Sequence, residues 1–446
     1  MHVKIFLDHV LLESRNESIQ YIMRGFCIII NDPEQLKTIE TRIIGVEGFE
    51  VFRAEDYTKS GFDRLAQTEI DVVLCDEKLH DGSSKTKQMK KALITLLVFH
   101  SVFTFAQTNS ALNPLKISGY VETYYSYDLS KPSDHNRPGF VYSFSRHNEV
   151  NLNLGFLKAA YQTEKTRANL AIMAGTYTNA NLAAEPGVLK NIFEANAGIK
   201  ISRNKNLWVD AGIFASHIGF ESAIGKDCWN LTRSILADNS PYYESGAKIS
   251  YTSNNEKWFV SGLILNGWQR IQRVNGNNTP AFGHQLTYKP GSKVTLNSSS
   301  FVGSNSPDST RKMRYFHNFY GLFQFHEKFG LTVGFDIGAE QKSKFSSSYN
   351  SWYSPVLIAR YSPTNKVNIA VRGEYYSDVY GVIISTGTTS GFQTFGYSLN
   401  FDYLIGENVV WRIEGRAFTS EDKLFTMNDK PSTNNYFAIT SLAISF

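Results

Sequence analysis

The feature that most constrains the fold is an alternation of apolar and polar residues that recurs in sixteen short segments of the C-terminal part of the chain. A period of two residues is typical of a β-strand whose two faces meet different surroundings, because successive side chains point to opposite sides. In one segment Trp411 and Ile413 alternate with Arg412, Glu414 and Arg416. The charges of each predicted strand therefore gather on one face and the apolar side chains on the other.

The segments and the connections between them predict a closed barrel. We expect strands near 115–127, 148–162, 167–179, 191–203, 207–221, 241–253, 257–272, 280–290, 293–304, 313–326, 329–342, 352–362, 366–378, 391–405, 409–420 and 434–446. Long connections such as 128–147 and 222–240 alternate with short ones such as 163–166 and 291–292. Short turns at one end and long loops at the other are typical of an all-β transmembrane antiparallel β-barrel. A soluble β-sandwich would alternate too, but its connections would not sort so regularly into two lengths.

Composition agrees with a barrel in a membrane and excludes other classes. Aromatic residues make up 14% of the chain and charged residues only 19%, which suits a wall that faces lipid on one side and water on the other. The net charge of +4 argues against a strongly basic nucleic-acid binder. The mean hydropathy of −0.27 excludes a bundle of membrane-spanning helices. Three cysteines are too few for a disulfide framework, and no spacing predicts a metal site or a cofactor.

A secretory signal stands in the middle of the chain. Met89-Lys90-Lys91 is followed by the apolar run ALITLLVFHSVFTFA, which ends at Ala106. A basic start, a short apolar stretch and small residues before a cleavage point describe a signal peptide, whereas a buried core helix is the alternative. We predict a signal peptide over 89–106, cleavage before Gln107, and translation that begins at Met89.

The preceding residues, 1–88, have a different pattern. Apolar strands alternate with amphipathic helices over residues 26–83, and this segment resembles the first half of a response-regulator receiver domain. The resemblance implies that Asp76 would accept phosphate and that Asp32 would help to hold magnesium. Asn31 stands where the family usually has an acid, and the chain turns into the signal sequence before a fourth strand. We therefore predict a truncated remnant, from a fusion or a start called too early, that is not phosphorylated.

The barrel segment, 107–446, resembles a known family. The stretches LKISGYVETYYSYDLS, DCWNLTRSILADNSPYYESGAKISYT and FVSGLILNGWQRIQ look like the OmpL-like β-barrel porins common in Bacteroidetes. The resemblance implies a porin in the outer membrane of a Gram-negative bacterium that lets small hydrophilic solutes diffuse through. About sixteen strands also enclose a lumen too wide for wall side chains to fill, and no separate plug domain is available.

The predicted pore residues come from the loop 222–240 and from the charged faces of the strands. In general porins the corresponding external loop folds inward, and the analogy implies a constriction at Lys226, Asp227, Arg233 and Asp238. The alternative is that these are solvated loop residues. The alternation predicts that the pore is lined by Glu122, Arg372, Glu374, Arg412, Glu414 and Arg416. Opposed charges across a narrow pore would create a transverse field that screens solutes by charge.

Further expectations concern partners and rival functions. The terminal Phe446 looks like the signal read by the outer-membrane barrel assembly machinery, and a homotrimer is possible because general porins often form one. Trp258 and Trp268 are candidate interfacial anchors or packing residues. A barrel adhesin or structural barrel is the main alternative, and a barrel hydrolase is the other. His317 and His326 lie near hydroxyl and acidic residues in the sequence, but nothing places a nucleophile beside an oriented base, so we expect no enzyme.

Overall fold

The computed structural model describes residues 26–30, 51–52, 72–76, 114–427 and 430–446. The chain divides into two compact units, Met1–Ser110 and Ala111–Phe446. In the first unit three short strands pair in parallel in the order β1-β3-β2, namely β1 (Phe26–Ile30), β2 (Val51–Phe52) and β3 (Val72–Asp76). Asp32 and the predicted signal peptide 89–106 lie outside the described residues.

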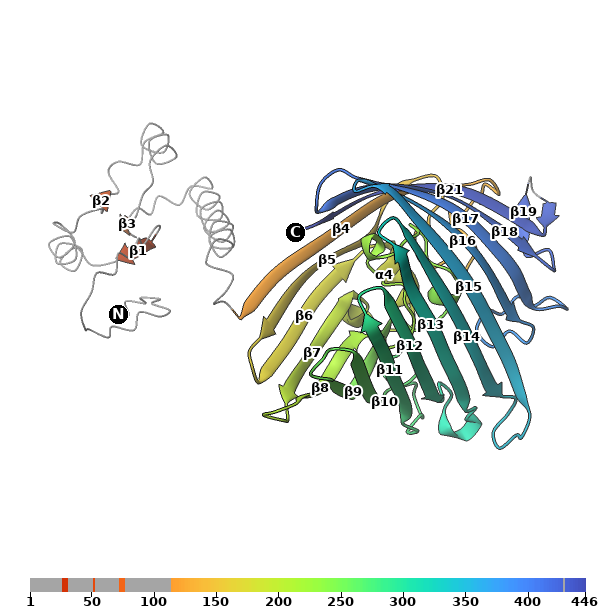
Figure 1. Cartoon of the computed structure of the whole chain (residues 1–446), viewed down its shortest axis with the longest axis horizontal. Helices are drawn as coiled ribbons and strands as arrows, with labels where there is room; N and C mark the ends of the chain where they lie inside the picture. The colour runs from red at the N-terminus through yellow and green to blue at the C-terminus, as the bar shows by residue number, and fades with distance from the viewer. Residues whose placement is uncertain (1–25, 31–50, 53–71, 77–113, 428–429) are drawn as a thin grey trace. The chain divides into compact units, whose positions relative to one another are not determined.

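The second unit is a closed barrel of sixteen strands, as the alternation predicted (Figure 1). Each strand pairs antiparallel with its neighbour, and the last strand closes on the first, so that Phe437 lies opposite Asp128 and Ser445 opposite Tyr120. The strands are β4 (Leu115–Asp128), β5 (Val150–Gln162), β6 (Thr166–Ala174), β7 (Ile192–Lys200), β8 (Asn206–Ala215), β9 (Tyr243–Thr252), β10 (Trp258–Leu265), β11 (Ala281–Gly291), β12 (Val294–Gly303), β13 (Arg314–His326), β14 (Phe329–Gln341), β15 (Tyr349–Thr364), β16 (Val367–Asp378), β17 (Phe392–Leu404), β18 (Val409–Ser420) and β21 (Asn434–Ser445).

The connections fall into two sets at opposite ends of the barrel. The end with brief connections, such as 163–165 and 327–328, is called the short-turn rim, and the other end the long-loop rim. The long loops carry the short helices α4 (Thr176–Asn181), η3 (Gly187–Asn191), η4 (Gly225–Asp227), α5 (Ile235–Asp238) and η5 (Asp308–Thr310), and the hairpin of β19 (Phe425–Met427) and β20 (Lys430–Ser432). Within the described part of the chain, no helix is both long and apolar enough to cross a membrane.

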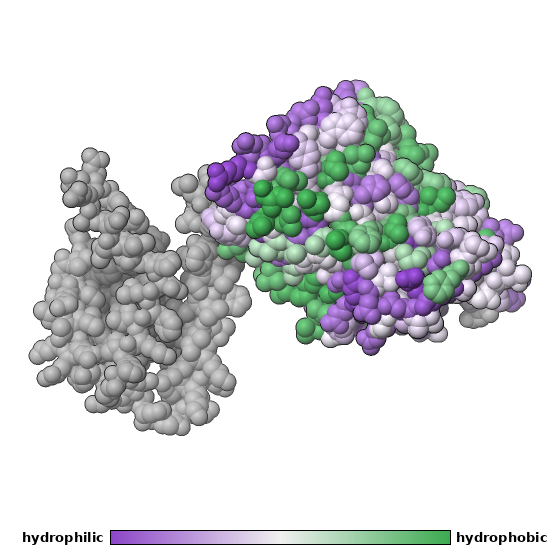
Figure 2. All heavy atoms as spheres, turned by 90° about the horizontal axis from the view of Figure 1, so that it is seen from below, coloured by the Kyte–Doolittle hydropathy of each residue, from purple (hydrophilic) through white to green (hydrophobic). Residues whose placement is uncertain are grey.

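The two faces of the barrel wall differ in polarity. On β18, Trp411 is 40% and Ile413 is 42% exposed, whereas the intervening Arg412 and Glu414 are at most 1% exposed. The same alternation repeats along most strands, and hydrophobic patches appear on the outer surface in Figure 2. An apolar face can be exposed over so large an area only where lipid or another protein covers it. The pattern is that of a barrel whose outer wall faces a bilayer.

The last residue completes the closure of the barrel. Phe446 exchanges backbone hydrogen bonds with Gly119 of β4, donating to its carbonyl at 3.0 Å and accepting from its N–H at 2.7 Å. The Phe446 ring lies over Gly119, and a Cβ at position 119 would come within 2.3 Å of the ring. An aromatic ring that covers a glycine on the neighbouring strand is a recurring way to pin strand register.

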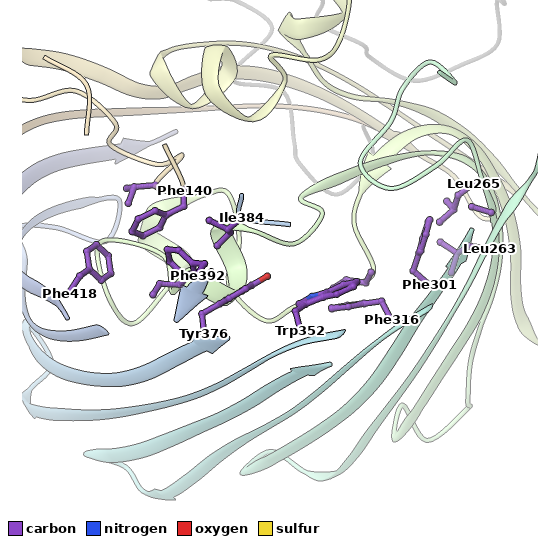
Figure 3. Packing of buried hydrophobic residues seen from close by; sticks show 14 of the residues in the cluster. Phe140, Leu263, Leu265, Phe301, Phe316, Trp352, Tyr376, Ile384, Phe392 and Phe418 are labelled. Atoms are coloured by element: carbon purple, nitrogen blue, oxygen red, sulfur yellow. The ribbon is translucent and has the colours of Figure 1, made fainter. Parts of the chain in front are cut away.

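Long loops fill part of the lumen with an apolar cluster. Phe140 and Ile384 from two long loops pack with Phe392 and Phe418 of the wall (Figure 3). The ring centroids of Phe140 lie 4.8 Å from Phe392 and 5.3 Å from Phe418, in edge-to-face geometry. Within the described residues, the barrel therefore has an apolar core inside its wall, built from loop and wall side chains.

The largest boundary difference is at the strand predicted for 257–272, since β10 ends at Leu265. Gly267 adopts φ +156° and the Asn266 side chain donates to the carbonyl of Ile271 at 2.8 Å, so the chain turns there. Trp268 points inside and packs edge-to-face on Phe301 and Phe316 at 5.1 and 4.8 Å. Trp268 is thus a packing residue and not an interfacial anchor.

Candidate functional site

The candidate site is the long loop 216–242, which leaves the end of β8 and folds into the lumen before β9 begins. Residues 230–241 are buried without exception. Ser234 caps α5 with its hydroxyl, which accepts from the N–H of Ala237 at 3.2 Å, and this sets the short helix inside the barrel. The expectation that this loop folds inward agrees with the structure.

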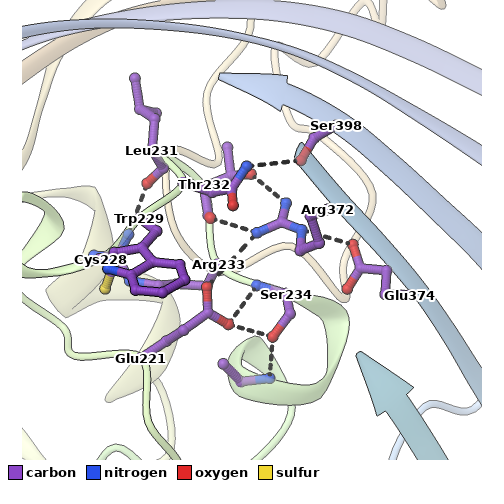
Figure 4. A network of polar contacts seen from close by, with 12 residues as sticks. Glu221, Cys228, Trp229, Leu231, Thr232, Arg233, Ser234, Arg372, Glu374 and Ser398 are labelled. Carbon is purple, nitrogen blue, oxygen red and sulfur yellow. Dashed lines mark hydrogen bonds and ion pairs between the residues drawn. The ribbon is translucent and has the colours of Figure 1, made fainter. Parts of the chain in front are cut away.

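The charged face of β16 and β18 receives the middle of the loop, and Figure 4 shows Arg372 and Glu374 of β16 beside the loop residue Thr232. Arg372 and Glu374 lie on β16, and Glu414 and Arg416 lie on β18, two strands away in the barrel order. Arg372 contacts Glu374 at 3.3 Å and Glu414 at 3.1 Å, and Arg416 forms an ion pair with Glu374. These four side chains are at most 4% exposed. β17 between them presents the small residues Gly396 and Ser398, so the long charged side chains can meet across it.

The loop backbone completes the hydrogen bonding of this charged cluster. Glu414 accepts from the N–H and the hydroxyl of Thr232 at 2.6 and 2.7 Å. Glu374 accepts from the N–H of Ile235 at 2.6 Å. Arg372 donates to the carbonyl of Thr232 at 2.7 Å. Buried ions are tolerated only when paired and hydrogen-bonded, so the wall charges and the loop backbone depend on each other.

A second anchor lies at the tip of the loop. Arg412 of β18 pairs with Asp402 of β17 at 2.7 Å and donates to the carbonyls of Gly225 and Cys228 at 2.7 and 2.9 Å. Within the loop, Arg233 donates to the carbonyls of Ser222, Leu231 and Ala223 at 2.6, 2.7 and 3.1 Å. Burial raises the pKa of the Cys228 thiol to about 11, which makes it an inert thiol.

A third anchor joins the start of the loop to the wall. His217 contacts a carboxylate oxygen of Glu244 at 2.7 Å through Nδ1 and the carbonyl of Ser300 at 2.8 Å through Nε2. Both ring nitrogens thus lie within hydrogen-bond distance of an oxygen acceptor, and although burial lowers the pKa of His217, Glu244 raises it above its usual value, which favours the charged imidazole. The charged imidazole and Glu244 form a buried ion pair.

Glycines on β14 make room for aromatic side chains of the loop. Trp229 lies against Gly330 and Phe220 against Gly334, and a Cβ at these glycines would come within 2.7 and 2.5 Å of the rings. The guanidinium of Arg360 stacks on Trp229 at 4.5 Å from the ring centroid. Alternate glycines along one strand face thus form a seat for the loop. The pattern GLTVGFDIG is visible in the sequence, but only the loop position gives it meaning.

The four predicted constriction residues divide into two pairs. Lys226 and Asp227 are exposed at the tip of the loop, whereas Arg233 and Asp238 are buried at 0 and 4%. Asp238 accepts a hydrogen bond from Ser143 of another long loop at 3.0 Å. Burial raises the pKa of Asp238 to about 7, against the opposing effects of Arg416 and Arg233. Arg233 and Asp238 therefore hold the loop in place and do not face open water.

The six predicted pore-lining residues all face the inside of the barrel, but the assignment as pore lining needs correction. Each is at most 4% exposed, because loop 216–242 or neighbouring side chains cover it. The six are Glu122, Arg372, Glu374, Arg412, Glu414 and Arg416. Their charges are matched by one another, by Asp402 and by loop amides and carbonyls, with Glu122 accepting from Asn153 at 2.9 Å. The alternation correctly predicted that these side chains face inward, but it could not show that the loop and neighbouring side chains cover them.

Half-exposed charges lie instead on the inner face of β5–β9. Lys158 pairs with Glu194 at 2.6 Å, and Arg167 binds both oxygens of Asp210 while stacking on Trp208 at 4.3 Å. The lysine and arginine side chains are 26 and 28% exposed. Beside this wall, a cavity of about 230 Å³ lies between the loop and residues such as Met173 and Phe193. Among the described residues, no three His, Cys, Asp or Glu side chains are grouped to hold a metal ion.

Comparison with known proteins gives a family and a fold. The family model described as putative beta-barrel porin-2, OmpL-like, matches residues 114–446. No curated protein matches the chain. The solved anion-selective porin from Comamonas acidovorans has 7% sequence identity and a TM-score of 0.50, over 74% of this chain and 99% of that one.

Two other solved structures are similar at lower scores. The outer membrane channel DcaP of Acinetobacter baumannii has 10% identity and a TM-score of 0.49, over 76% of this chain and 99% of that one. Salmonella typhi OmpF, solved with daunomycin, has 9% identity and a TM-score of 0.47 over the same shares. At 7% identity, the similarity to the anion-selective porin indicates the fold only.

Proposed function

We propose, from the premise that this chain belongs to the putative beta-barrel porin-2, OmpL-like family, that it is an outer-membrane porin through which small hydrophilic solutes diffuse passively. The observation that carries the proposal is the closed sixteen-strand barrel with an apolar outer wall and a charged inner wall. A closed barrel satisfies its backbone hydrogen bonds without an edge, which allows it to span a bilayer. The short-turn rim would face the periplasm and the long-loop rim the cell exterior, as in other barrels of this kind.

The water path we propose runs along the wall of β5–β9. The opposite wall, from β12 to β18, is covered by loop 216–242, while the inner face of β5–β9 keeps half-exposed charges such as Lys158 and Arg167. Lys226 and Asp227, exposed at the loop tip, would narrow this path. Arg233, Asp238 and the six buried wall residues would fix the position of the constriction rather than touch the solute.

Liposome swelling tests the channel directly. Purified full-length chain and chain begun at Met89 are each reconstituted into liposomes, which are then placed in isosmotic sugars and amino acids. We expect both preparations to let small solutes in and to exclude large oligosaccharides. Permeation indistinguishable from that of protein-free liposomes would contradict the porin function and would favour an adhesin or structural barrel.

N-terminal sequencing of the membrane-localised protein tests our proposal of a signal peptide over 89–106 and of an unused remnant over 1–88.

We also propose that three barrels associate through the outer face of β11–β13. His284, Ser298, Ser300 and His317 lie on this face, with Ser300 Oγ 2.5 Å from His284 Nδ1 and Ser298 Oγ 2.8 Å from His317 Nε2. Imidazoles and hydroxyls are costly against lipid, and contact with another copy would remove them from it. Mass measurement in detergent should give a trimer that His284→Leu weakens, and a monomeric parent protein would contradict the proposal.

Closure by Phe446 supports a role for this residue in assembly by the barrel assembly machinery. Its backbone extends the β21–β4 pairing by one residue beyond Ser445. We expect deletion of Phe446 to lower the amount of barrel found in the outer membrane. Equal amounts of the deleted and parent proteins would contradict this role.

A further inference from the structure

We infer that the channel selects for anionic solutes, because the lumen towards the short-turn rim is lined by lysines that have no ion-pair partner among the described residues. This inference rests on the proposed porin function and adds the substrate class. Where a water-filled passage is lined by one sign of charge, the field raises the local concentration of ions of the opposite sign. Selectivity therefore depends on the inward-facing charges that have no partner of opposite sign.

The carboxylates of this inner wall are already engaged. Asp210 binds Arg167 through both oxygens, and Glu194 binds Lys158. Each of these pairs is close to neutral in sum. Any net charge on the wall of β5–β9 must therefore come from cations outside these pairs.

Four further lysines face inward on β4, β7, β9 and β11. Three of them lie opposite inward residues of the neighbouring strand: Lys116 opposite Ala160, Lys200 opposite Trp208 and Lys248 opposite Asp210. Lys289 follows the inward Thr287 by two residues and so lies on the same face of β11. In the described part of the chain none of the four has a carboxylate within ion-pair distance. The Lys248 ammonium instead lies 4.8 Å from the centre of the Phe214 ring.

Lys226 adds a fifth cation at the tip of the loop. Its Nζ donates to Ser445 Oγ at 2.6 Å, beside the end of the last strand, and the side chain is exposed. The neighbouring Asp227 is the carboxylate closest in sequence and is exposed too. Among the described residues at this end of the lumen, these five lysines outnumber Asp227, the exposed carboxylate beside them, and leave the lumen near the short-turn rim positively charged.

The short turns themselves reinforce this sign. These turns carry seven exposed cations and only four exposed carboxylates. The carboxylates are Glu164, Glu256, Glu327 and Glu407. The cations are Lys165, Arg203, Lys205, Lys257, Lys293, Lys328 and Lys366. The Debye length is about 8 Å at physiological ionic strength, so salt screens these rim charges more than the charges inside the lumen. The inward lysines should therefore dominate selectivity, with the rim as a weaker contribution.

The test is the reversal potential of single channels in planar bilayers of neutral phosphatidylcholine, under a tenfold gradient of KCl. Neutral lipid removes any contribution from anionic headgroups bound to the rim lysines. We expect a potential of the sign that marks chloride preference, and a loss of about two- to fivefold in the anion-to-cation permeability ratio in Lys200→Gln/Lys248→Gln. The matched control, Lys131→Gln/Lys342→Gln, removes two cations from the long loops and should change the ratio much less.

The outcomes separate this inference from the porin itself. Channels that conduct but prefer potassium, or a ratio that both double variants change equally, would overturn anion selection and leave the porin intact. No conductance from the parent protein would overturn the porin and the inference with it. Heat-modifiable migration in gel electrophoresis checks that each variant is a folded barrel, and Lys200→Arg/Lys248→Arg should restore the parent ratio.

Discussion

The two halves of the barrel's inner wall have similar residues and different surroundings. On β16 and β18 five inward charges are buried beneath loop 216–242, and each is matched by a partner of opposite sign or by loop backbone: Arg372, Glu374, Arg412, Glu414 and Arg416. Along β5–β9 the inward Lys158 and Arg167 are half exposed, and Lys200 and Lys248 have no ion-pair partner among the described residues. Inward charges on the covered wall therefore anchor the loop, whereas those on the uncovered wall contact solvent. The position of loop 216–242 determines this difference.

The largest effect is expected from a substitution at Arg372, in the wall that the loop covers. In Arg372→Met, Glu374 and Glu414 lose a buried counter-ion, and an uncompensated buried charge costs about 3–5 kcal/mol. We expect the loop to leave its seat, so that single-channel conductance rises and the denaturation midpoint of the folded barrel falls. Conductance equal to that of the parent protein would show that the loop does not depend on this cluster.

A smaller effect should follow from filling the glycine seat on β14. Gly334→Val places methyl groups where the Phe220 ring lies, and overpacking of this kind costs about 1–3 kcal/mol. Conductance noise from loop movement is the measurement. Gly373→Ala is the control, because a Cβ there meets nothing within 4 Å. If the two variants behave alike, Gly334 does not seat the loop.

A rise in pH from weakly acidic to neutral should loosen the same loop. Burial raises the pKa of Asp238 to about 7, so the stabilisation from its protonated form is lost as pH rises through that value. Despite burial, which lowers it, the pKa of His217 is raised by Glu244, so the stabilisation from its charged form is also lost as pH rises. We expect conductance fluctuations to grow between about pH 5 and pH 8. Asp238→Asn/His217→Gln should flatten this dependence, and an unchanged profile would exclude these two groups as its cause.

The smallest effect on stability should come from the half-exposed wall. Lys158→Gln removes one partner of an ion pair whose side chains are 26 and 16% exposed, and such pairs contribute about 0–1 kcal/mol. The denaturation midpoint should stay close to that of the parent protein. A loss as large as that of Arg372→Met would erase the difference between the two walls.

The sequence by itself determined the barrel. Alternation is a local property, because steric constraints place successive side chains of a strand on opposite faces whatever the rest of the chain does. The sixteen strands, their inward and outward residues, the loop 222–240 and the closing position of Phe446 all follow from that pattern and from connection lengths. Membership of the porin family adds to these predictions and does not contradict them.

Only the tertiary structure decided which inward residues meet water. Thr232 and Glu414, which join the loop to the wall, are 182 residues apart in the chain, and no local pattern records such a contact. Arg233 is buried and Lys226 exposed in the same loop, although both are cations of similar size. A charged side chain can be buried only where partners from distant strands satisfy it, and the folded barrel alone brings those partners together.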